Sequence, residues 1–315
     1  MPVALPTPSL TGLATQWSPQ PVALAAIVIA AGWYLWSVRR LERAWPATHS
    51  WCLASGIALA VWTTNGFPQA YGTSLFWIWC MQMLILLMVV PVLLMLGQPV
   101  ELAERSRGPR SPVVRVAGSR LGRLCGHALV GPALIPAVSV LLFFGAVPGW
   151  AIHYPVAGWV LQVAVVVVGA LIVLPLVASA ENRSSMAVGL ALAVGVFELL
   201  LDAVPGIVLR LHTTLATSYF DYRTPQSWAL SPIHDQQIGG AFLWTVAEII
   251  DLPFLFVVFL RWIRADAGDA ERIDTVLDAE RIARGEPVEQ NEGVLDQPWW
   301  LDDPAMRKRL GHRPR

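Results

Sequence analysis

Four carboxylates lie inside long apolar stretches of the sequence, where an ionised group is costly. Glu198 and Asp202 are spaced i, i+4, and Glu248 and Asp251 are spaced i, i+3, so each pair occupies one face of a helix. Ionisable groups at membrane depth must be paired, protonated or hydrated, which makes them candidates for a functional site. The same spacing also fits neutral acids that hydrogen-bond between helices or hold another subunit. The sequence leaves both alternatives open.

Soft sulfur donors gather at the start of another apolar stretch, at Cys80, Met81 and Met83. Thiolate and thioether ligands suit Cu(I), because soft ligands match a soft ion. Methionine is also an ordinary gap-filler of apolar packing. This segment therefore predicts either a weak copper site or packing alone.

Three histidines, His153, His212 and His234, are predicted to lie on one face of the membrane. They could converge on a metal, although their separations in the sequence match no metal-ligand spacing. Solvated or hydrogen-bonded histidines are the alternative. The sequence contains no phosphate-binding glycine loop, no nucleophile elbow and no paired-histidine haem pattern. We therefore do not expect an enzyme.

The composition sets the surroundings in which these side chains must act. Hydrophobic residues make up 55% of the 315 positions and charged residues only 14%, at a net charge of zero. Soluble domains carry roughly 25% charged residues, so a water-soluble fold is excluded, and no basic footprint for nucleic acid is present. The expected partners are membrane lipid and other membrane proteins.

The apolar residues form seven stretches, each about the 20 residues that a membrane-spanning helix needs. The sequence thus predicts an all-α, polytopic membrane helix bundle. We expect residues 1–20 to be an outer N-terminal segment, 21–263 the seven-helix domain and 264–315 a charged cytoplasmic tail. The seven stretches lie near 21–38, 51–67, 74–97, 127–148, 157–179, 186–210 and 240–262.

Arginines in the connecting loops predict the orientation. Loops on one side contain ten arginines, from Arg39 to Arg183, whereas the other side has only Arg210 and Arg223. Basic residues are retained in the cytoplasm, so the N-terminus is expected outside and the C-terminus inside.

One segment, Ser231–Trp244, resembles the signature that opens the last helix of CtaG-type cytochrome c oxidase assembly proteins. The following Glu248 and the run Arg261–Asp266 resemble the actinobacterial branch of that family. A second run, Met88–Pro99, is similar to that family's Met-x-x-Pro-x-Leu-Leu-x-Leu-Gly-x-Pro pattern. The resemblance implies about seven spans in a bacterial cell membrane and a role in maturing a copper-containing terminal oxidase. The signature residues matched are Asp235, Gln236, Gly239, Gly240 and Trp244.

The sequence departs from the family where the family has His-Met-x-x-His. Both histidines are replaced, by Trp79 and Met83, and Gln162 and Glu198 stand near the places of further family histidines. Any copper is therefore expected as weakly bound Cu(I), and otherwise no cofactor is expected.

Two hypotheses follow for the function. The first is a membrane protein that binds terminal oxidase subunits, or other respiratory-chain membrane proteins, and assists copper insertion or maturation. The second is a degenerate, metal-free paralogue that stays as an accessory subunit of the oxidase complex. A transporter that uses the intramembrane carboxylates is a third alternative.

Overall fold

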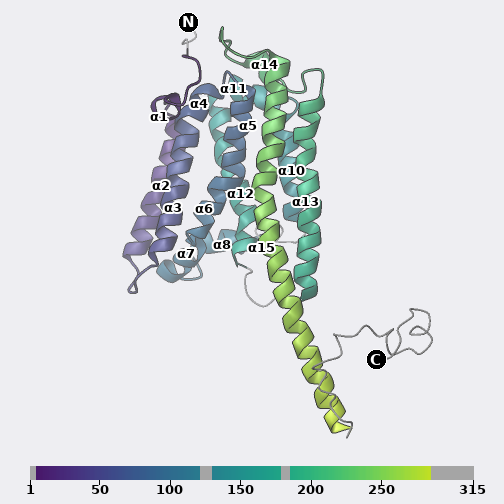
Figure 1. The fold of residues 1–315 in the computed structure, drawn as a ribbon. Helices are drawn as coiled ribbons and strands as arrows, with labels where there is room; N and C mark the ends of the chain where they lie inside the picture. The colour runs from purple at the N-terminus through teal and green to yellow at the C-terminus, as the bar shows by residue number, and fades with distance from the viewer. Residues whose placement is uncertain (1–4, 121–129, 179–184, 285–315) are drawn as a thin grey trace, which may run out of the picture. The chain divides into compact units, whose positions relative to one another are not determined.

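The computed structural model describes residues 5–120, 130–178 and 185–284, apart from some side chains of the later helices. The regular structure of these residues is helical, which confirms the all-α prediction (Figure 1). A long helix occupies most of each predicted apolar stretch. The helices are α2 (Pro21–Arg39), α3 (Ala47–Asn65), the continuous run of α5 (Phe76–Leu84), η1 (Ile85–Val89) and α6 (Val90–Leu96), α10 (Val130–Phe143), α12 (Pro155–Ala178), α13 (Ser185–Leu211) and α15 (Pro232–Ala283).

Three helices of the described residues are long and apolar enough to cross a membrane, namely Pro21–Arg39, Phe76–Leu96 and Pro155–Val173. Over the apolar stretch of each helix, 56% of Phe76–Leu96 is buried inside the protein. The buried share is 17% for Pro21–Arg39 and 22% for Pro155–Val173. The run α5–η1–α6 is therefore the central helix, while the other two helices expose apolar side chains, as lipid contact requires. The protein is a membrane protein, and seven spans remain a prediction.

Short helices cover the two ends of this helix bundle (Figure 1). We call the first the short-helix end; it has α1 (Gly12–Thr15), α4 (Phe67–Tyr71), α11 (Val147–His153) and α14 (Tyr219–Tyr222). The opposite end, which we call the arginine end, has α7 (Pro99–Arg107) and α8 (Pro112–Ala117).

A π-helical turn at Ile85–Val89 interrupts the central helix just before Pro91. Proline has no N–H to donate to the carbonyl four residues earlier, here that of Leu87, and its ring crowds that carbonyl. A wider turn relieves the crowding. Gly169 of α12 faces this place so closely that a Cβ there would lie 2.1 Å from the Leu87 oxygen.

The main hydrophobic core surrounds the central helix on the side of the short-helix end. Phe76 and Tyr219 meet edge to face, with ring centroids 5.1 Å apart, and neither is exposed. Other members of this core are Trp79, Cys80, Met83, Leu86, Leu142, Phe143 and Leu209. The densest apolar packing thus lies beneath the short-helix end.

The chain divides into two compact units, Met1–Ile263 and Arg264–Arg315. The first contains the helix bundle and every contact discussed below. Of the second, the described residues continue α15 as helix to Ala283.

Candidate functional site

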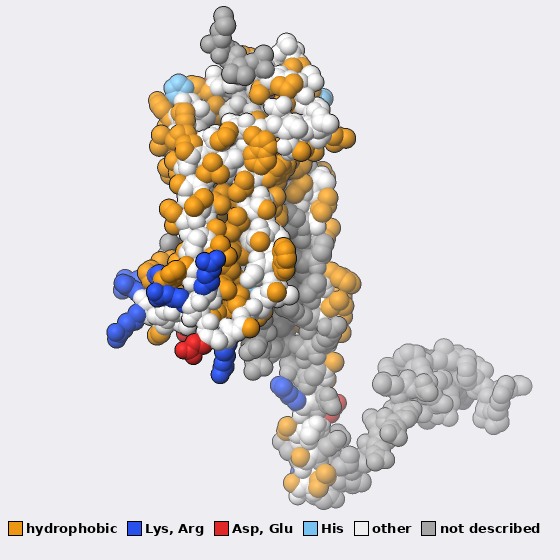
Figure 2. All heavy atoms as spheres, turned by 90° about the vertical axis from the view of Figure 1, so that its left-hand side faces the viewer, with side chains coloured by type: hydrophobic (Ala, Val, Ile, Leu, Met, Phe, Trp, Pro, Cys, Tyr) orange, Lys and Arg blue, Asp and Glu red, His pale blue; other side chains and the backbone are white. Residues whose placement is uncertain are grey.

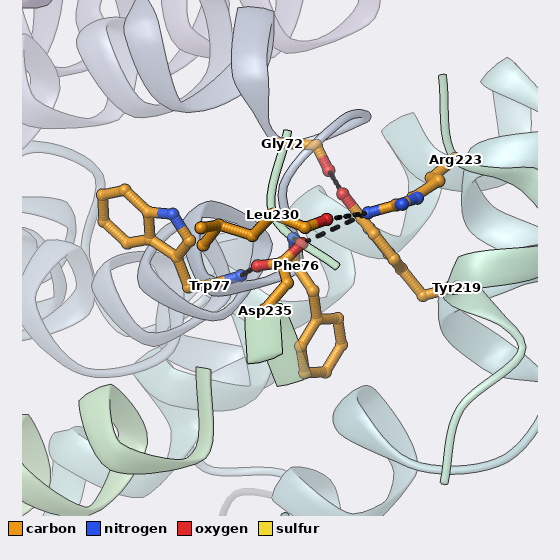
Figure 3. Close-up of polar contacts among 7 residues, drawn as sticks. All are labelled: Gly72, Phe76, Trp77, Tyr219, Arg223, Leu230 and Asp235. Atoms are coloured by element: carbon orange, nitrogen blue, oxygen red, sulfur yellow. Dashed lines mark hydrogen bonds and ion pairs between the residues drawn. The ribbon is translucent and has the colours of Figure 1, made fainter. Parts of the chain in front are cut away.

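The side chain of Asp235 closes the beginning of the central helix. It comes from the first turn of α15, is fully buried, and accepts hydrogen bonds from the backbone N–H of Phe76 at 2.8 Å and of Trp77 at 3.1 Å (Figure 3). No side chain of α5's own N-cap residue, Leu75, makes a capping bond. Since the first N–H groups of a helix have no partner within it, Asp235 supplies the missing acceptor from 159 residues away.

Arg223 balances the charge of this buried carboxylate. Its Nη1 lies 3.8 Å from the Asp235 Oδ2 and also donates to the Leu230 carbonyl at 3.3 Å (Figure 3). Burial raises the pKa of Asp235, and the two backbone donors and Arg223 counteract that shift only in part. Asp235 therefore joins the starts of α5 and α15 with the loop before α15.

Tyr219 ties α14 to the connection between α4 and α5. Its hydroxyl donates to the Gly72 carbonyl at 2.8 Å, deep beneath α14 (Figure 3). Burial, reinforced by the negative charge of Asp235, raises the pKa of this hydroxyl well above its usual value. Tyr219 therefore remains a neutral hydrogen-bond donor at physiological pH.

Gln236, the next residue along the signature, fixes the connection between α13 and α14. Its Oε1 accepts from the Ala216 N–H at 2.8 Å, and its Nε2 donates to the Thr214 carbonyl at 3.0 Å. The side chain has no exposed surface. A buried amide whose oxygen and nitrogen both bond to one loop favours a single conformation of that loop.

The two signature glycines let neighbouring helices touch α15. A Cβ at Gly240 would lie 2.6 Å from the Gly206 carbonyl of α13, and a Cβ at Gly239 would lie 2.8 Å from the Phe76 ring. Small residues at such crossings allow backbones within a membrane to approach closely. Trp244, in contrast, is 39% exposed and donates from its indole nitrogen to Glu248.

A cluster of three glutamines, Gln69, Gln82 and Gln162, joins α4, α5 and α12. The Gln69 Oε1 accepts from Gln82 Nε2 at 2.7 Å and from Gln162 Nε2 at 2.6 Å. Gln82 also donates to the Thr63 carbonyl at 3.0 Å, and both Gln82 and Gln162 are buried. This amide cluster crosslinks three helices of the bundle, and its Gln82 lies six residues after Phe76 along α5.

The sulfur donors do not form one set. Cys80 and Met83 are fully buried in the main core around α5, whereas Met81 packs against a second cluster that contains Phe67 and Tyr71. Cys80 and Met83 are three residues apart and share one face of α5, whereas Met81 lies on another face. The thiol and thioether groups thus fit packing better than a shared copper ion.

The three histidines occupy separate surroundings on the short-helix end. His153 packs between Tyr154 and Tyr222, with ring centroids 4.5 and 4.7 Å away, and His212 and His234 are exposed. In the described part of the chain, no three His, Cys, Asp or Glu residues are placed to hold a metal ion. A metal at these histidines stays a prediction without geometric support.

Of the four carboxylates, two have described side chains. Asp202 is buried at 8% exposure and lines a small cavity with Met88 and Ser139, while Glu248 is half-buried beside Trp244. The side chains of Glu198 and Asp251 lie outside the described residues. The predicted pairing of acids on one helix face is therefore untested.

The chain matches a known protein family over a range that contains the Asp235 junction. The family of the cytochrome c oxidase caa3 assembly factor (Caa3_CtaG) matches residues 32–265. The chain belongs to this family. The matched range includes the whole Asp235 junction, the glutamine cluster and the glycine crossing, so the resemblance seen in the Ser231–Trp244 segment is confirmed.

Mycobacterial proteins are the curated relatives that this Caa3_CtaG protein matches. It is 25% identical over 289 residues to uncharacterized proteins of Mycobacterium bovis and Mycobacterium tuberculosis, and 24% identical over 273 residues to one of Mycobacterium leprae. These alignments cover 82–87% of this chain but only 41–43% of the relatives. The chain thus spans less than half the length of these relatives. No solved structure matches it.

Sequence reasoning missed several of the residues that build this site. The sequence indicated Arg223 only as one of the loop arginines that predict orientation, and it pointed to neither Tyr219 nor Gln69. A signal for the glutamine cluster was present in the polar end of the second apolar stretch, Thr63–Asn65, since polar groups at membrane depth need partners. No local sequence pattern indicates that Arg223 and Tyr219 lie near Asp235.

Proposed function

We propose that this protein assists the assembly of a cytochrome c oxidase as a non-catalytic protein of the bacterial cell membrane. Membership of the caa3 assembly factor family over residues 32–265 carries this proposal. The paired contacts of Asp235 and Gln236 support it, because they give the family signature a physical role: fixing the short-helix end in one conformation. A preformed surface reduces the ordering cost of binding a membrane partner such as an oxidase subunit.

The direct test removes the gene from its own host. We expect a loss of assembled oxidase, seen as reduced haem–copper absorbance and reduced subunit levels, and full recovery with the wild-type gene. Transcript levels of the oxidase subunits serve as the control for an indirect effect. Normal amounts of active oxidase in the deletion strain would refute the proposal.

A metal-free accessory subunit is the second candidate, and the separation of the sulfur donors favours it. Cys80 and Met83 pack in one cluster and Met81 in another, so these three sulfur donors do not form one set for a copper transfer step. An assembly factor leaves the mature complex, whereas a subunit stays. Stoichiometric amounts of this chain in the purified oxidase, retained through a salt wash, would select the subunit.

We further propose seven spans, with the N-terminus and the short-helix end outside. The loop arginines support this orientation, since Arg105 and Arg107 belong to α7 at the opposite end (Figure 1), where Lys and Arg side chains gather in Figure 2. A reporter enzyme active only outside should work when fused after Gly145, and one active only inside when fused after Arg264. Activity of the two reporters in the reversed compartments would overturn the orientation.

The metal content of the purified protein is also predictable. Because no set of described donors converges, we expect detergent-solubilised protein to retain no stoichiometric copper after a chelator wash. Any Cu(I) added back should bind weakly and be lost on oxidation, since thioethers supply no charge to Cu(II). Replacing Cys80, Met81 and Met83 by leucine or alanine should abolish even this binding. Tight copper unaffected by these changes would contradict the prediction.

A further inference from the structure

Two guanidinium groups at the arginine end share one indole ring. The Cζ of Arg40, at the end of α2, lies 3.9 Å from the centroid of the Trp36 ring, and the Cζ of Arg107, at the end of α7, lies 4.3 Å from it. Because both distances are measured to the Trp36 ring, the two guanidinium carbons lie within about 8 Å of each other. This separation is roughly one Debye length at physiological salt. Two cations are thus held together on an aromatic surface.

No carboxylate neutralises this pair in the described part of the chain. The ion pairs found there join Arg105 to Glu101 and Arg223 to Asp235, and neither includes Arg40 or Arg107. The two segments 39–43 and 101–120 contain eight arginines and only three glutamates, and blue side chains gather at this end in Figure 2. The pair therefore lacks a counter-anion.

Backbone and side-chain packing hold the two arginines in place. The helices α2 and α7 contact each other, and the buried Tyr34 of α2 donates to the Gly97 carbonyl at 3.1 Å just before α7. Trp45 in turn donates to the Tyr34 hydroxyl at 2.8 Å. These contacts join α2 to the start of α7, the helix whose last turn contains Arg107.

The site lies where lipid headgroups lie. Trp36 stands in the last turn of Pro21–Arg39, a candidate membrane span, and is 37% exposed. Tryptophan is enriched at the membrane–water interface, and arginines at the end of a span extend toward it. Three buried hydroxyls on the same segments, of Ser37, Ser106 and Ser111, have no hydrogen-bond partner among the described residues.

We propose that Trp36, Arg40 and Arg107 bind the phosphate of an anionic phospholipid. Guanidinium groups recognise phosphate oxygens through paired, charge-assisted hydrogen bonds. The exposed apolar side chains of α2, among them Val28 and Ile29, lie on the membrane side of the site and can contact the acyl chains. Free phosphate has the same charge chemistry but makes no such apolar contact, which is why the lipid is the occupant.

Native mass spectrometry of the full chain in detergent tests this proposal, with phosphatidylglycerol and phosphatidylcholine as probes. The wild type should bind phosphatidylglycerol about tenfold more tightly than phosphatidylcholine, because juxtamembrane arginines each add affinity for anionic headgroups. The double variant Arg40→Gln/Arg107→Gln should lose most of this preference. Inorganic phosphate should not displace the bound lipid.

The matched control is Arg43→Gln/Arg110→Gln, which removes the same charge from exposed arginines of the same end that have no described contact with Trp36. It should keep most of the preference. The proposal fails if the Arg40/Arg107 variant keeps the wild-type preference, if the control loses as much, or if phosphate displaces the lipid. Should the double variant not extract intact, the single change Arg107→Gln gives the same test with a smaller expected loss.

Discussion

Replacing Asp235 by alanine should destabilise the protein by about 3 kcal/mol, because each buried partner left without a hydrogen bond costs roughly 1–3 kcal/mol. The Phe76 and Trp77 N–H groups would lose the carboxylate that caps them, at the start of the most buried of the three described candidate spans. Arg223 would keep the Leu230 carbonyl and the Phe220 ring, whose centroid lies 5.5 Å from its Cζ, but would lose its carboxylate partner. The free energy of unfolding, from sodium dodecyl sulfate titration of the protein in mixed micelles, measures the loss.

The variant Asp235→Asn separates the hydrogen bonds from the charge. Its amide oxygen can accept one backbone N–H but cannot serve both Phe76 and Trp77 in the way two carboxylate oxygens do, so an intermediate loss is expected. The matched control is Gln237→Ala, two residues further along α15, whose side chain makes a long, exposed contact of 3.5 Å to the His212 carbonyl. An Asp235→Ala protein as stable as this control would show that the cap contributes nothing.

The helices of this fold could be predicted from the sequence because they depend on local composition. Runs of about 20 apolar residues leave the backbone no choice but helix in a bilayer, where all N–H and C=O groups must pair within the segment. The structure accordingly has a long helix at each predicted stretch. It also revealed that the third stretch is central and the fifth peripheral, although both have the same mean hydropathy of 2.5.

The site was predictable only in part, because it depends on contacts between distant residues. The signature residues Asp235, Gln236 and Gly240 could be singled out by resemblance, but their roles required the start of α5, the 214–216 loop and Gly206 to be placed beside them. Sequence spacing grouped Cys80, Met81 and Met83, whereas helix geometry separates Met81 from the other two. Neighbours in sequence are thus poor evidence for a shared ligand on a helix.

The loop arginines bear on two features, the orientation of the chain and the proposed lipid site. Their distribution between loops predicts orientation and needs no structure. Which of them share a surface does need one, since Arg40 and Arg107 are far apart in the sequence and meet only at Trp36. The same residues that orient the chain therefore also form the proposed lipid site.

The change Gly169→Ala should destabilise the bundle by about 3 kcal/mol, at the upper end of the cost of overpacking a core. An added Cβ would lie 2.1 Å from the Leu87 carbonyl oxygen and 2.6 Å from the Pro91 ring. Neither group can move aside, because the π-helical turn of Ile85–Val89 already positions that carbonyl next to proline. Helix α12 must then separate from the central helix, which also strains the Gln162–Gln69 hydrogen bond.

Size-exclusion chromatography after extraction and the same unfolding titration measure this effect. Gly32→Ala is the matched control, because Gly32 lies in a lipid-exposed helix and an added Cβ there meets nothing within 4 Å. Alanine is favoured over glycine within a helix by about 1 kcal/mol, so this control should stabilise the protein slightly or leave it unchanged. The two identical chemical changes should therefore act in opposite directions, and equal stability of both variants would refute the close approach of α12 to Leu87.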